Sequence, residues 1–182
     1  LPVRDDAWLA GFTKGMTELS RQAGCPLLGG DTTRTAKVGD IHAPVTISIT
    51  AMGELPQSMG LTRAGARPGD DIWVSGCVGG AWAALMHRWG KLTLDARVFP
   101  SAALAMDRPN PRNALGTALL SSATACADIS DGLAQDLGHI LERSGVDADV
   151  LWDAVPKHPA LAALSQEQQV EAAISGGDDY EL

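Results

Sequence analysis

The segment 127–133 constrains this chain most, because it places two carboxylates, Asp128 and Asp131, at the start of an amphipathic run. Apolar residues continue the run with the spacing of a helix that has one buried face, at positions 133, 137, 140 and 141. Ser130 is a typical N-cap and Gly145 a typical C-terminal stop, so we expect a helix between them. Both carboxylates should therefore lie at a helix amino end.

Two interpretations of this acidic helix start are open. The structural one is a well-capped helix whose acidic first turn complements the helix dipole. The functional one is a site for Mg²⁺, which commonly takes one or two protein carboxylates, several waters and the phosphates of a nucleotide. The sequence Gly29-Gly30-Asp31 has the same ambiguity. It is either a tight turn with an Asx hydrogen bond or a carboxylate presented at the end of a strand.

Other motifs for catalysis are weak. The Gly-rich residues 76–80 precede a helical stretch and offer backbone N–H groups to a phosphate, but they lack the Lys-Ser/Thr of a P-loop and the GxGxxG spacing. The four histidines are scattered, and no Gly-x-Ser-x-Gly elbow is present. Carboxylates, glycines and an occasional arginine remain, which is the inventory expected for phosphoryl transfer.

Composition indicates a globular protein without nucleic-acid or membrane partners. Hydrophobic residues make up 45% of the chain and charged residues 20%, enough to build a core. The net charge of −8 and the lack of a basic stripe argue against nucleic acid. No apolar run is long enough to span a membrane, and no signal peptide is visible. Three isolated cysteines predict small buried thiols in a reducing compartment, hence a cytoplasmic location: Cys25, Cys77 and Cys126.

Helical and strand-like segments alternate along the chain, which predicts α/β or α+β layers. We expect a helix at 5–24, whose apolar face packs in a core, and further helices at 81–86, 113–121 and 166–173. We expect strands at 25–28, 44–55, 72–74 and 148–151. A domain boundary is predicted near Met59-Gly60.

Several stretches together resemble the thiamine-monophosphate kinase family, within the larger group that includes aminoimidazole ribonucleotide synthetase and selenophosphate synthetase. They follow the family's order over almost the whole chain and comprise residues 28–34, 61–70, 109–112, 128–140 and 175–182. The last two stretches are the most specific. The resemblance implies a two-domain aminoimidazole ribonucleotide synthetase-like α/β (α+β) architecture with both domains incomplete. Residues 1–59 would be the C-terminal part of the N-terminal ATP- and metal-binding domain, and 60–182 a truncated C-terminal α/β domain.

The chain opens on Leu1 and stops at Leu182, where a strand would be starting, so we expect an interior piece of a longer protein. In the family, the region before Leu1 completes the metal cluster and forms much of a homodimer interface, and strands beyond Leu182 line the substrate site. The resemblance thus implies a homodimer for the complete protein. The isolated piece is expected to bind nucleotide poorly and to be inactive alone.

The implied activity is the ATP- and Mg²⁺-dependent phosphorylation of thiamine monophosphate to thiamine diphosphate by direct in-line transfer. By motif position, the resemblance implies metal ligation by Asp31, Asp128 and Asp131. It also implies ATP contacts from Gly30, Arg63 and Ser130, and a thiamine-phosphate contact from Asp178, where the family usually carries Glu. The alternative for Arg63 is a surface salt bridge. No general base is required, because the acceptor phosphate is mostly dianionic at neutral pH.

Two further hypotheses stay open. The chain is either a different ATP-dependent enzyme of the same group, acting on another phosphate or carbonyl oxygen, or a truncated product without catalytic activity. Assays with thiamine monophosphate, aminoimidazole precursors and selenide separate the enzymatic alternatives. The non-catalytic alternative predicts no in-frame acidic Gly-Asp-Asp motif in the DNA upstream of Leu1.

Overall fold

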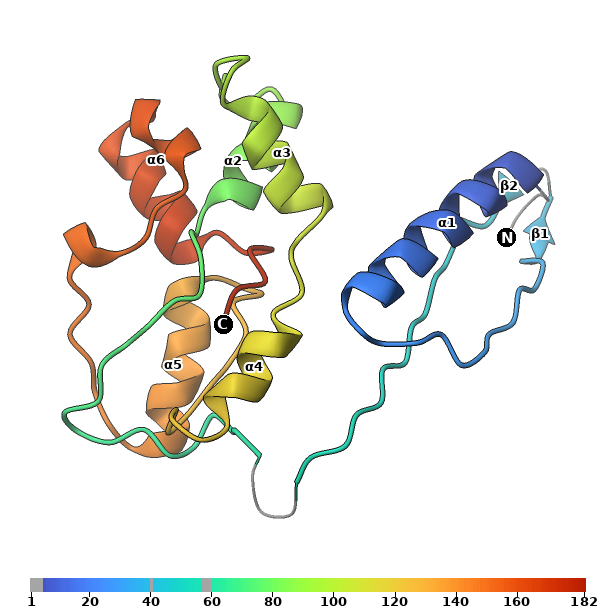
Figure 1. Ribbon diagram of the computed structural model, residues 1–182. Helices are drawn as coiled ribbons and strands as arrows, with labels where there is room; N and C mark the ends of the chain where they lie inside the picture. The colour runs from blue at the N-terminus through green and yellow to red at the C-terminus, as the bar shows by residue number, and fades with distance from the viewer. Residues whose placement is uncertain (1–4, 40, 57–59) are drawn as a thin grey trace. The chain divides into compact units, whose positions relative to one another are not determined.

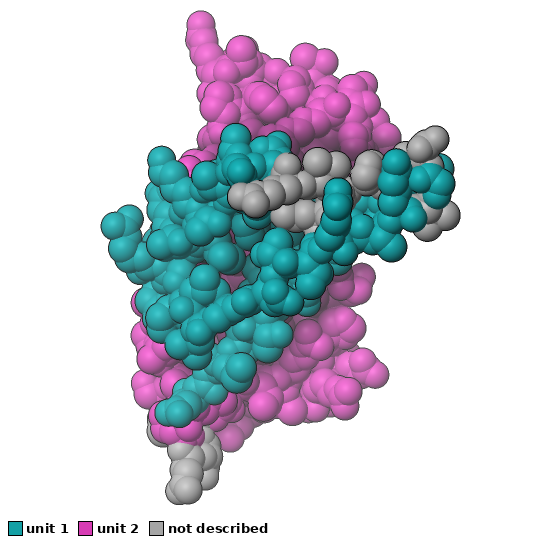
Figure 2. All heavy atoms as spheres, turned by 90° about the vertical axis from the view of Figure 1, so that its right-hand side faces the viewer, with its two compact units in different colours: residues 1–54 teal, residues 55–182 magenta. Residues whose placement is uncertain are grey.

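The computed structural model describes residues 5–39, 41–56 and 60–182 of the chain. The chain divides into two compact units, Leu1–Glu54 and Leu55–Leu182, which Figure 2 shows in different colours. Met59, at the boundary predicted from the sequence, lies outside the described residues.

Unit 1 contains helix α1, Asp6–Gln22, and a short antiparallel hairpin of β1, Lys37–Val38, and β2, Ile41–His42. The helix predicted at the amino end is therefore confirmed. The Asp5 side chain caps it by accepting a 2.9 Å hydrogen bond from the N–H of Trp8. No residue of α1 is buried, so the prediction that its apolar face lies in a core is wrong for this unit.

Two strands predicted in unit 1 are not formed in its described residues. Residues 25–28 and 44–55 have no strand pairing, and Leu28 and Ile49 are exposed. Alternating β-branched residues favour an extended backbone, but a strand exists only when a neighbouring strand accepts its hydrogen bonds. The described part of unit 1 supplies no such neighbour for either segment.

Unit 2 is built from helices and short helical turns, with α2 packed on α3 (Figure 1). Its helices are α2 Gly80–Arg88, α3 Phe99–Asp107, α4 Asn113–Leu119, α5 Leu133–Ser144 and α6 Gln166–Val170, with turns η1 Trp152–Ala154, η2 Pro159–Ala163 and η3 Glu171–Ser175. The helices predicted at 81–86, 113–121 and 166–173 and the one after the acidic motif are confirmed. The strands predicted at 72–74 and 148–151 are not formed in the described residues. None of the described helices is long and apolar enough to cross a membrane.

The hydrophobic core of unit 2 carries the elements that hold the acidic motif. Val78 and Leu161 are its largest fully buried side chains, and small alanines of α2, α3 and η3 complete it. Ile129 and Leu133 belong to the same cluster. The acidic motif is therefore anchored by its apolar residues, which leaves its carboxylates Asp128 and Asp131 at the surface.

The three cysteines are free thiols with different exposure. Cys25 and Cys77 are exposed, and Cys126 is half-buried. The prediction of small buried cysteines is therefore wrong for the first two. Burial, followed by the charge of Asp128, raises the pKa of Cys126.

The amino end of α5 is capped from inside its own first turn. The N-cap position is Gly132, without a side-chain cap, so the prediction of Ser130 as N-cap is wrong. Asp136, only 3% exposed, instead accepts hydrogen bonds at one carboxylate oxygen from the N–H groups of Ser130 (2.9 Å), Asp131 (2.9 Å) and Gly132 (3.2 Å). A buried carboxylate is tolerable when several N–H groups solvate it. Asp136 thereby holds the backbone of residues 130–132 in one conformation.

A second buried carboxylate fastens the last residues of the chain to α2. The Oδ2 atom of Asp179 accepts a 2.8 Å hydrogen bond from the N–H of Gly79, and the N–H of Ala81 also donates to this carboxylate. Its Oδ1 atom is buried without a hydrogen-bond partner. Burial raises the pKa of Asp179 to about 6, although the two N–H groups act in the opposite direction. In the Gly-rich residues 76–80, a carboxylate of the protein thus occupies the N–H group of Gly79, which would otherwise be available to a phosphate.

We predict that replacing Asp136 by Ala lowers the free energy of unfolding by about 2–3 kcal/mol, because three N–H groups, one buried and two part-buried, lose their acceptor. Glu142→Ala is the matched control, since it removes an exposed carboxylate from the same helix. Denaturant unfolding followed by circular dichroism measures both. Equal losses in the two variants would contradict the structural role of Asp136.

Asp179→Asn should change how stability depends on pH. Folding raises the pKa of Asp179 from 3.8 to about 6. The protonated carboxyl group therefore contributes fully to stability when the pH is below the pKa of the unfolded chain, and this contribution is lost as the pH rises through about 6. The Asn side chain does not titrate. As the pH rises from about 4 to about 7.5, the free energy of unfolding of the variant should therefore increase by about 2 kcal/mol relative to that of the natural protein. Denaturant unfolding at several pH values tests this. Parallel pH profiles for the two proteins would refute the assignment.

Candidate functional site

Two acidic motifs far apart in the sequence meet in unit 2. We call residues 127–132 the acidic loop and residues 176–182 the closing segment. The N–H of Ile129 donates to the carbonyl of Glu181 at 2.8 Å, and the N–H of Tyr180 donates to the carbonyl of Ile129 at 2.8 Å. The N–H of Asp178 donates to the carbonyl of Ser130 at 2.9 Å. These bonds bring the closing segment back to the amino end of α5 (Figure 1).

The close approach of the two segments depends on a glycine. A Cβ atom added at Gly177 would lie 2.5 Å from the carbonyl oxygen of Ser130 and 3.3 Å from the Cα of Asp131. Real Cβ atoms do not approach backbone oxygen so closely, so any side chain here would push the segments apart. Gly177 therefore permits the pairing that places Asp178 beside the acidic loop.

The backbone on either side of Asp179 adopts a left-handed conformation. Asp178 has φ 66° and Tyr180 has φ 51°, values that non-glycine residues seldom take. This arrangement turns Asp179 into the protein while Asp178 and Tyr180 stay exposed. Such backbone strain is concentrated at functional sites, where surrounding contacts maintain it.

The pKa of Tyr180 is affected by the negative charge of the surrounding carboxylates. Its hydroxyl donates a 3.0 Å hydrogen bond to Oδ1 of Asp178. This bond and the charge of Asp178 raise the pKa of Tyr180, desolvation raises it further, and the charges of Asp128 and Asp131 add to the effect. Three exposed carboxylates from two segments thus act on one phenol. The site is a negatively charged surface that favours cations.

Four of the predicted site residues are brought together in this way. Asp128 and Asp131 are exposed in the acidic loop, Ser130 is half-buried between them, and Asp178 faces them from the closing segment. Gln135 donates a 3.4 Å hydrogen bond to Oδ2 of Asp131. The pairing of the closing segment with the acidic loop is what unites these residues.

Arg63 lies at the opposite end of α5 from this group. The hydroxyl of Ser144, the last residue of α5, donates to the carbonyl of Arg63 at 3.1 Å. The same hydroxyl accepts from the N–H groups of Gly65 and Ala66. The 12 residues of α5 separate this anchor from the acidic loop by about 18 Å. Unit 2 therefore does not bring the backbone of Arg63 to the carboxylates.

Gly30 and Asp31 belong to unit 1 and are exposed there. Oδ1 of Asp31 accepts a 2.8 Å hydrogen bond from the N–H of Thr32. This bond joins adjacent residues, whereas an Asx turn would bond the N–H two residues further on. Residues 29–32 form neither a regular turn nor a strand, so neither interpretation of this motif is confirmed.

The carboxylates of the acidic loop suit a hard divalent cation. Within the described residues, no group of three or more His, Cys, Asp or Glu side chains is arranged to hold a metal ion. Mg²⁺ needs fewer protein ligands, because it keeps several waters and binds through one or two carboxylates together with phosphate oxygens. Asp128 and Asp131, both exposed and three positions apart, provide such a donor pair.

Three carboxylates that hold the site in place were not predicted from the sequence. Asp136, Asp179 and Glu181 all accept hydrogen bonds that hold the acidic loop or the closing segment in place. Asp136 lies three residues after Leu133 and four before Ile140, at the edge of the apolar face, and is buried there.

Comparison with known proteins extends over the whole chain. The family described as AIR synthase related protein, N-terminal domain, matches residues 1–55. Thiamine-monophosphate kinase of Salmonella typhimurium is 38% identical over 187 residues, which cover 100% of this chain and 54% of that protein. The enzyme of Escherichia coli K12 is 37% identical over 184 residues, with the same coverage of 100% and 54%.

Solved structures agree with the sequence comparison. The crystal structure of thiamine-monophosphate kinase from Stenotrophomonas maltophilia K279a matches with a TM-score of 0.89 and 40% identity, covering 100% of this chain and 57% of that one. AaThiL complexed with AMPPCP and TMP matches with a TM-score of 0.59 and 31% identity, covering 66% of this chain and 40% of that one.

The chain thus spans about half the length of the curated relatives it matches. Over that length it has the AIR synthase-related fold, which confirms the predicted fold class. The resemblance noted in the sequence motifs is likewise confirmed by identity along the entire chain. Along its whole length the chain is similar to thiamine-monophosphate kinases, of which it spans about half.

Proposed function

We propose that this chain forms part of a kinase that transfers the γ-phosphoryl group of ATP to thiamine monophosphate, giving thiamine diphosphate and ADP. The observation that carries the proposal is the convergence of Asp128, Asp131 and Asp178 around Tyr180. The names of the relatives support it, as does the AaThiL structure, which holds AMPPCP and TMP. A carboxylate-rich surface does not attract phosphates by itself, so the proposal includes Mg²⁺.

Asp128 and Asp131 would hold Mg²⁺ in unit 2, and Asp31 would contribute from unit 1. When bound, Mg²⁺ supplies positive charge that neutralises the phosphates. The protein's own contribution is to keep the two loop carboxylates exposed and in place. Burial of Ile129 and the three hydrogen bonds to Asp136 achieve this, because they fix the backbone that carries both side chains.

The remaining site residues are assigned to the two substrates. Ser130, Gly30 and Arg63 would contact ATP, and Asp178 would lie at the thiamine-phosphate end. The backbone N–H and carbonyl of Ser130 are both hydrogen-bonded within the protein, so its hydroxyl is the group that would meet a ligand. Arg63 offers a permanently charged planar fork suited to phosphate oxygens.

The proposed transfer requires positioning rather than proton abstraction. The acceptor phosphate has a second pKa of about 6 and is mostly dianionic at neutral pH, so it needs no general base. His158 serves the fold instead, since its Nδ1 accepts a 3.1 Å hydrogen bond from the N–H of Ala160 and burial lowers its pKa. Catalysis by this chain would then rest on orientation and charge.

We also infer that residues 1–59 form the C-terminal part of an N-terminal domain and residues 60–182 a C-terminal α/β domain. The family match at residues 1–55 and the division of the chain after Glu54 support this assignment. A cytoplasmic location remains a prediction from the sequence.

The first test incubates this chain with ATP, Mg²⁺ and thiamine monophosphate and measures thiamine diphosphate by mass spectrometry. The same assay uses the chain extended at both ends with the corresponding regions of the Salmonella typhimurium relative. Asp131→Asn should lower turnover about 100-fold or more in the active form, because charge stabilisation at the reacting phosphates is lost. Asp149→Asn, an exposed carboxylate outside the site, should leave turnover unchanged.

Folding of each variant is checked by circular dichroism. A folded extended chain that makes no thiamine diphosphate would overturn the proposed function, and product from aminoimidazole precursors or selenide would assign a different substrate. Near-normal turnover of Asp131→Asn would remove Asp131 from the metal site.

We further propose that the complete protein is a homodimer. In unit 1, large apolar side chains between residues 27 and 52 are exposed, among them Leu28, Ile49 and Met52. Such surfaces favour association with another chain. Light scattering over a range of concentrations should give a mass above that of one chain, and a strictly monomeric profile at high concentration would contradict the proposal.

A further inference from the structure

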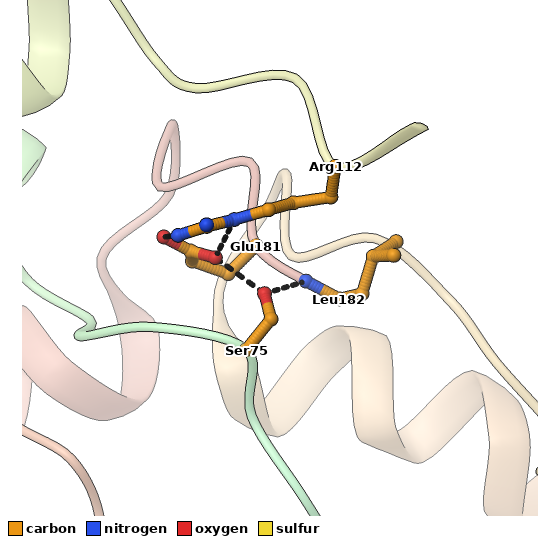
Figure 3. Close-up of polar contacts among 4 residues, drawn as sticks. All are labelled: Ser75, Arg112, Glu181 and Leu182. Carbon is orange, nitrogen blue, oxygen red and sulfur yellow. Dashed lines mark hydrogen bonds and ion pairs between the residues drawn. The ribbon is translucent and has the colours of Figure 1, made fainter. Parts of the chain in front are cut away.

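The side chain of Glu181 joins three separate segments of unit 2. Arg112 donates to it through Nε, at 2.6 Å from Oε2, and through Nη2, at 2.5 Å from Oε1 (Figure 3). The hydroxyl of Ser75 also donates to Oε2. Both carboxylate oxygens are therefore engaged, in the bidentate geometry that makes arginine–carboxylate pairs strong and directional.

Ser75 continues this network to the residue that follows. The N–H of Leu182 donates to the hydroxyl oxygen of Ser75 at 2.9 Å (Figure 3). The N–H of Ser75 donates in turn to the carbonyl of Leu182 at 2.9 Å. The segment containing Ser75 thus holds Glu181 by its side chain and Leu182 by its backbone. We call Ser75, Arg112, Glu181 and Leu182 the anchor cluster.

The carboxylate of Glu181 lies where a side chain at position 76 would be, so Gly76 leaves the room that it needs. A Cβ atom added at Gly76 would lie 2.2 Å from Oε1 of Glu181 and 2.4 Å from its Cδ. The carboxylate has little freedom to move away, because Arg112 holds both of its oxygens. Arg112 itself follows Pro109 and Pro111, whose rings restrict the backbone that presents it.

The burial of the pair distinguishes it from an ordinary surface contact. The side chain of Glu181 is 13% exposed and that of Arg112 is 26% exposed. Arg88 and Asp107 also form a bidentate pair, between α2 and α3, but their side chains are 40% and 47% exposed. Exposed pairs contribute little, whereas removing one partner of a buried pair leaves an uncompensated charge.

The anchor cluster lies next to the residues of the candidate site. The carbonyl of Glu181 accepts the N–H of Ile129, and the adjacent Tyr180 donates to the carbonyl of Ile129. The position of Glu181 therefore sets how the closing segment lies along the acidic loop. Arg112 and Glu181 can place the closing segment in this way without either side chain contacting the reacting phosphates.

We propose that Arg112 and Glu181 are positioning residues, whose ion pair holds Asp178 and Tyr180 in register with the carboxylates of the acidic loop. The importance of this register for phosphoryl transfer rests on the proposed function above. The structural part of the proposal does not, so the two are measured separately.

Amide hydrogen exchange tests the structural part in the absence of ATP and metal. In Glu181→Gln and in Arg112→Lys, the N–H groups of Ile129, Asp178 and Tyr180 should exchange about tenfold faster or more, because local opening becomes easier. Gly76→Ala should do the same while keeping both charges, since its methyl group displaces the carboxylate. Asp107→Asn is the matched control, because it breaks the exposed pair and should leave these three amides unchanged.

Titration of the phenol gives a second readout, because Tyr180 is the single tyrosine of the chain. Its ionisation is followed by phenolate absorbance, with circular dichroism confirming that the chain stays folded. Glu181→Gln should shift the pKa of Tyr180 toward its ordinary value, because Asp178 no longer keeps its place beside the phenol. Asp107→Asn should leave the titration unchanged.

Kinetics with the active form of the protein test the functional part. Glu181→Gln and Arg112→Lys should lower kcat about tenfold to hundredfold, as expected for misplaced reacting groups. Asp107→Asn should retain normal kcat. Unchanged amide exchange and unchanged phenol titration in both pair variants would overturn the positioning role. Failure of the proposed function would appear instead as no thiamine diphosphate from the natural protein, with the exchange results unaffected.

Discussion

The hydrogen bonds between Ile129 and the closing segment are the interaction on which the candidate site depends. Ile129 is buried in the core of unit 2, and its backbone N–H and carbonyl bind Glu181 and Tyr180 on the other segment. The same residue thus connects the apolar core to the acidic surface. If this pairing opened, Asp178 would lose its place beside Asp128 and Asp131, and the carboxylates would no longer act on one region of space.

Carboxylates have two different tasks in this part of the protein, and burial separates them. Asp136 and Glu181 are largely removed from water and are stabilised by N–H groups or by Arg112, so they fix the backbone. Asp128, Asp131 and Asp178 are exposed and remain available to a cation. Asp179 is also buried, but only one of its oxygens accepts hydrogen bonds at the start of α2, and the other is buried without a partner. Its raised pKa is the electrostatic consequence of that position.

Prediction from the sequence succeeded for helices and failed for strands, and the reason is physical. The helix α5 and its stop at Gly145 follow from apolar spacing and local capping rules that involve only nearby residues. A strand at 44–55 requires a partner that the described part of unit 1 does not supply, although its alternation is regular. The N-cap of α5 was wrongly assigned to Ser130, because the actual acceptor, Asp136, reaches back from within the helix.

The linear order of residues was sufficient to recognise the resemblance to thiamine-monophosphate kinases, the helices of unit 2 other than α3, and the carboxylates of the acidic loop, because motif spacing and helical periodicity are local properties. Tertiary structure alone decided that the acidic loop lies beside the closing segment, that Gly177 permits this approach and that Arg112 pairs with Glu181. These contacts join residues distant along the chain. They form only when the apolar core closes around Ile129 and Leu133, so no local pattern of residues encodes them.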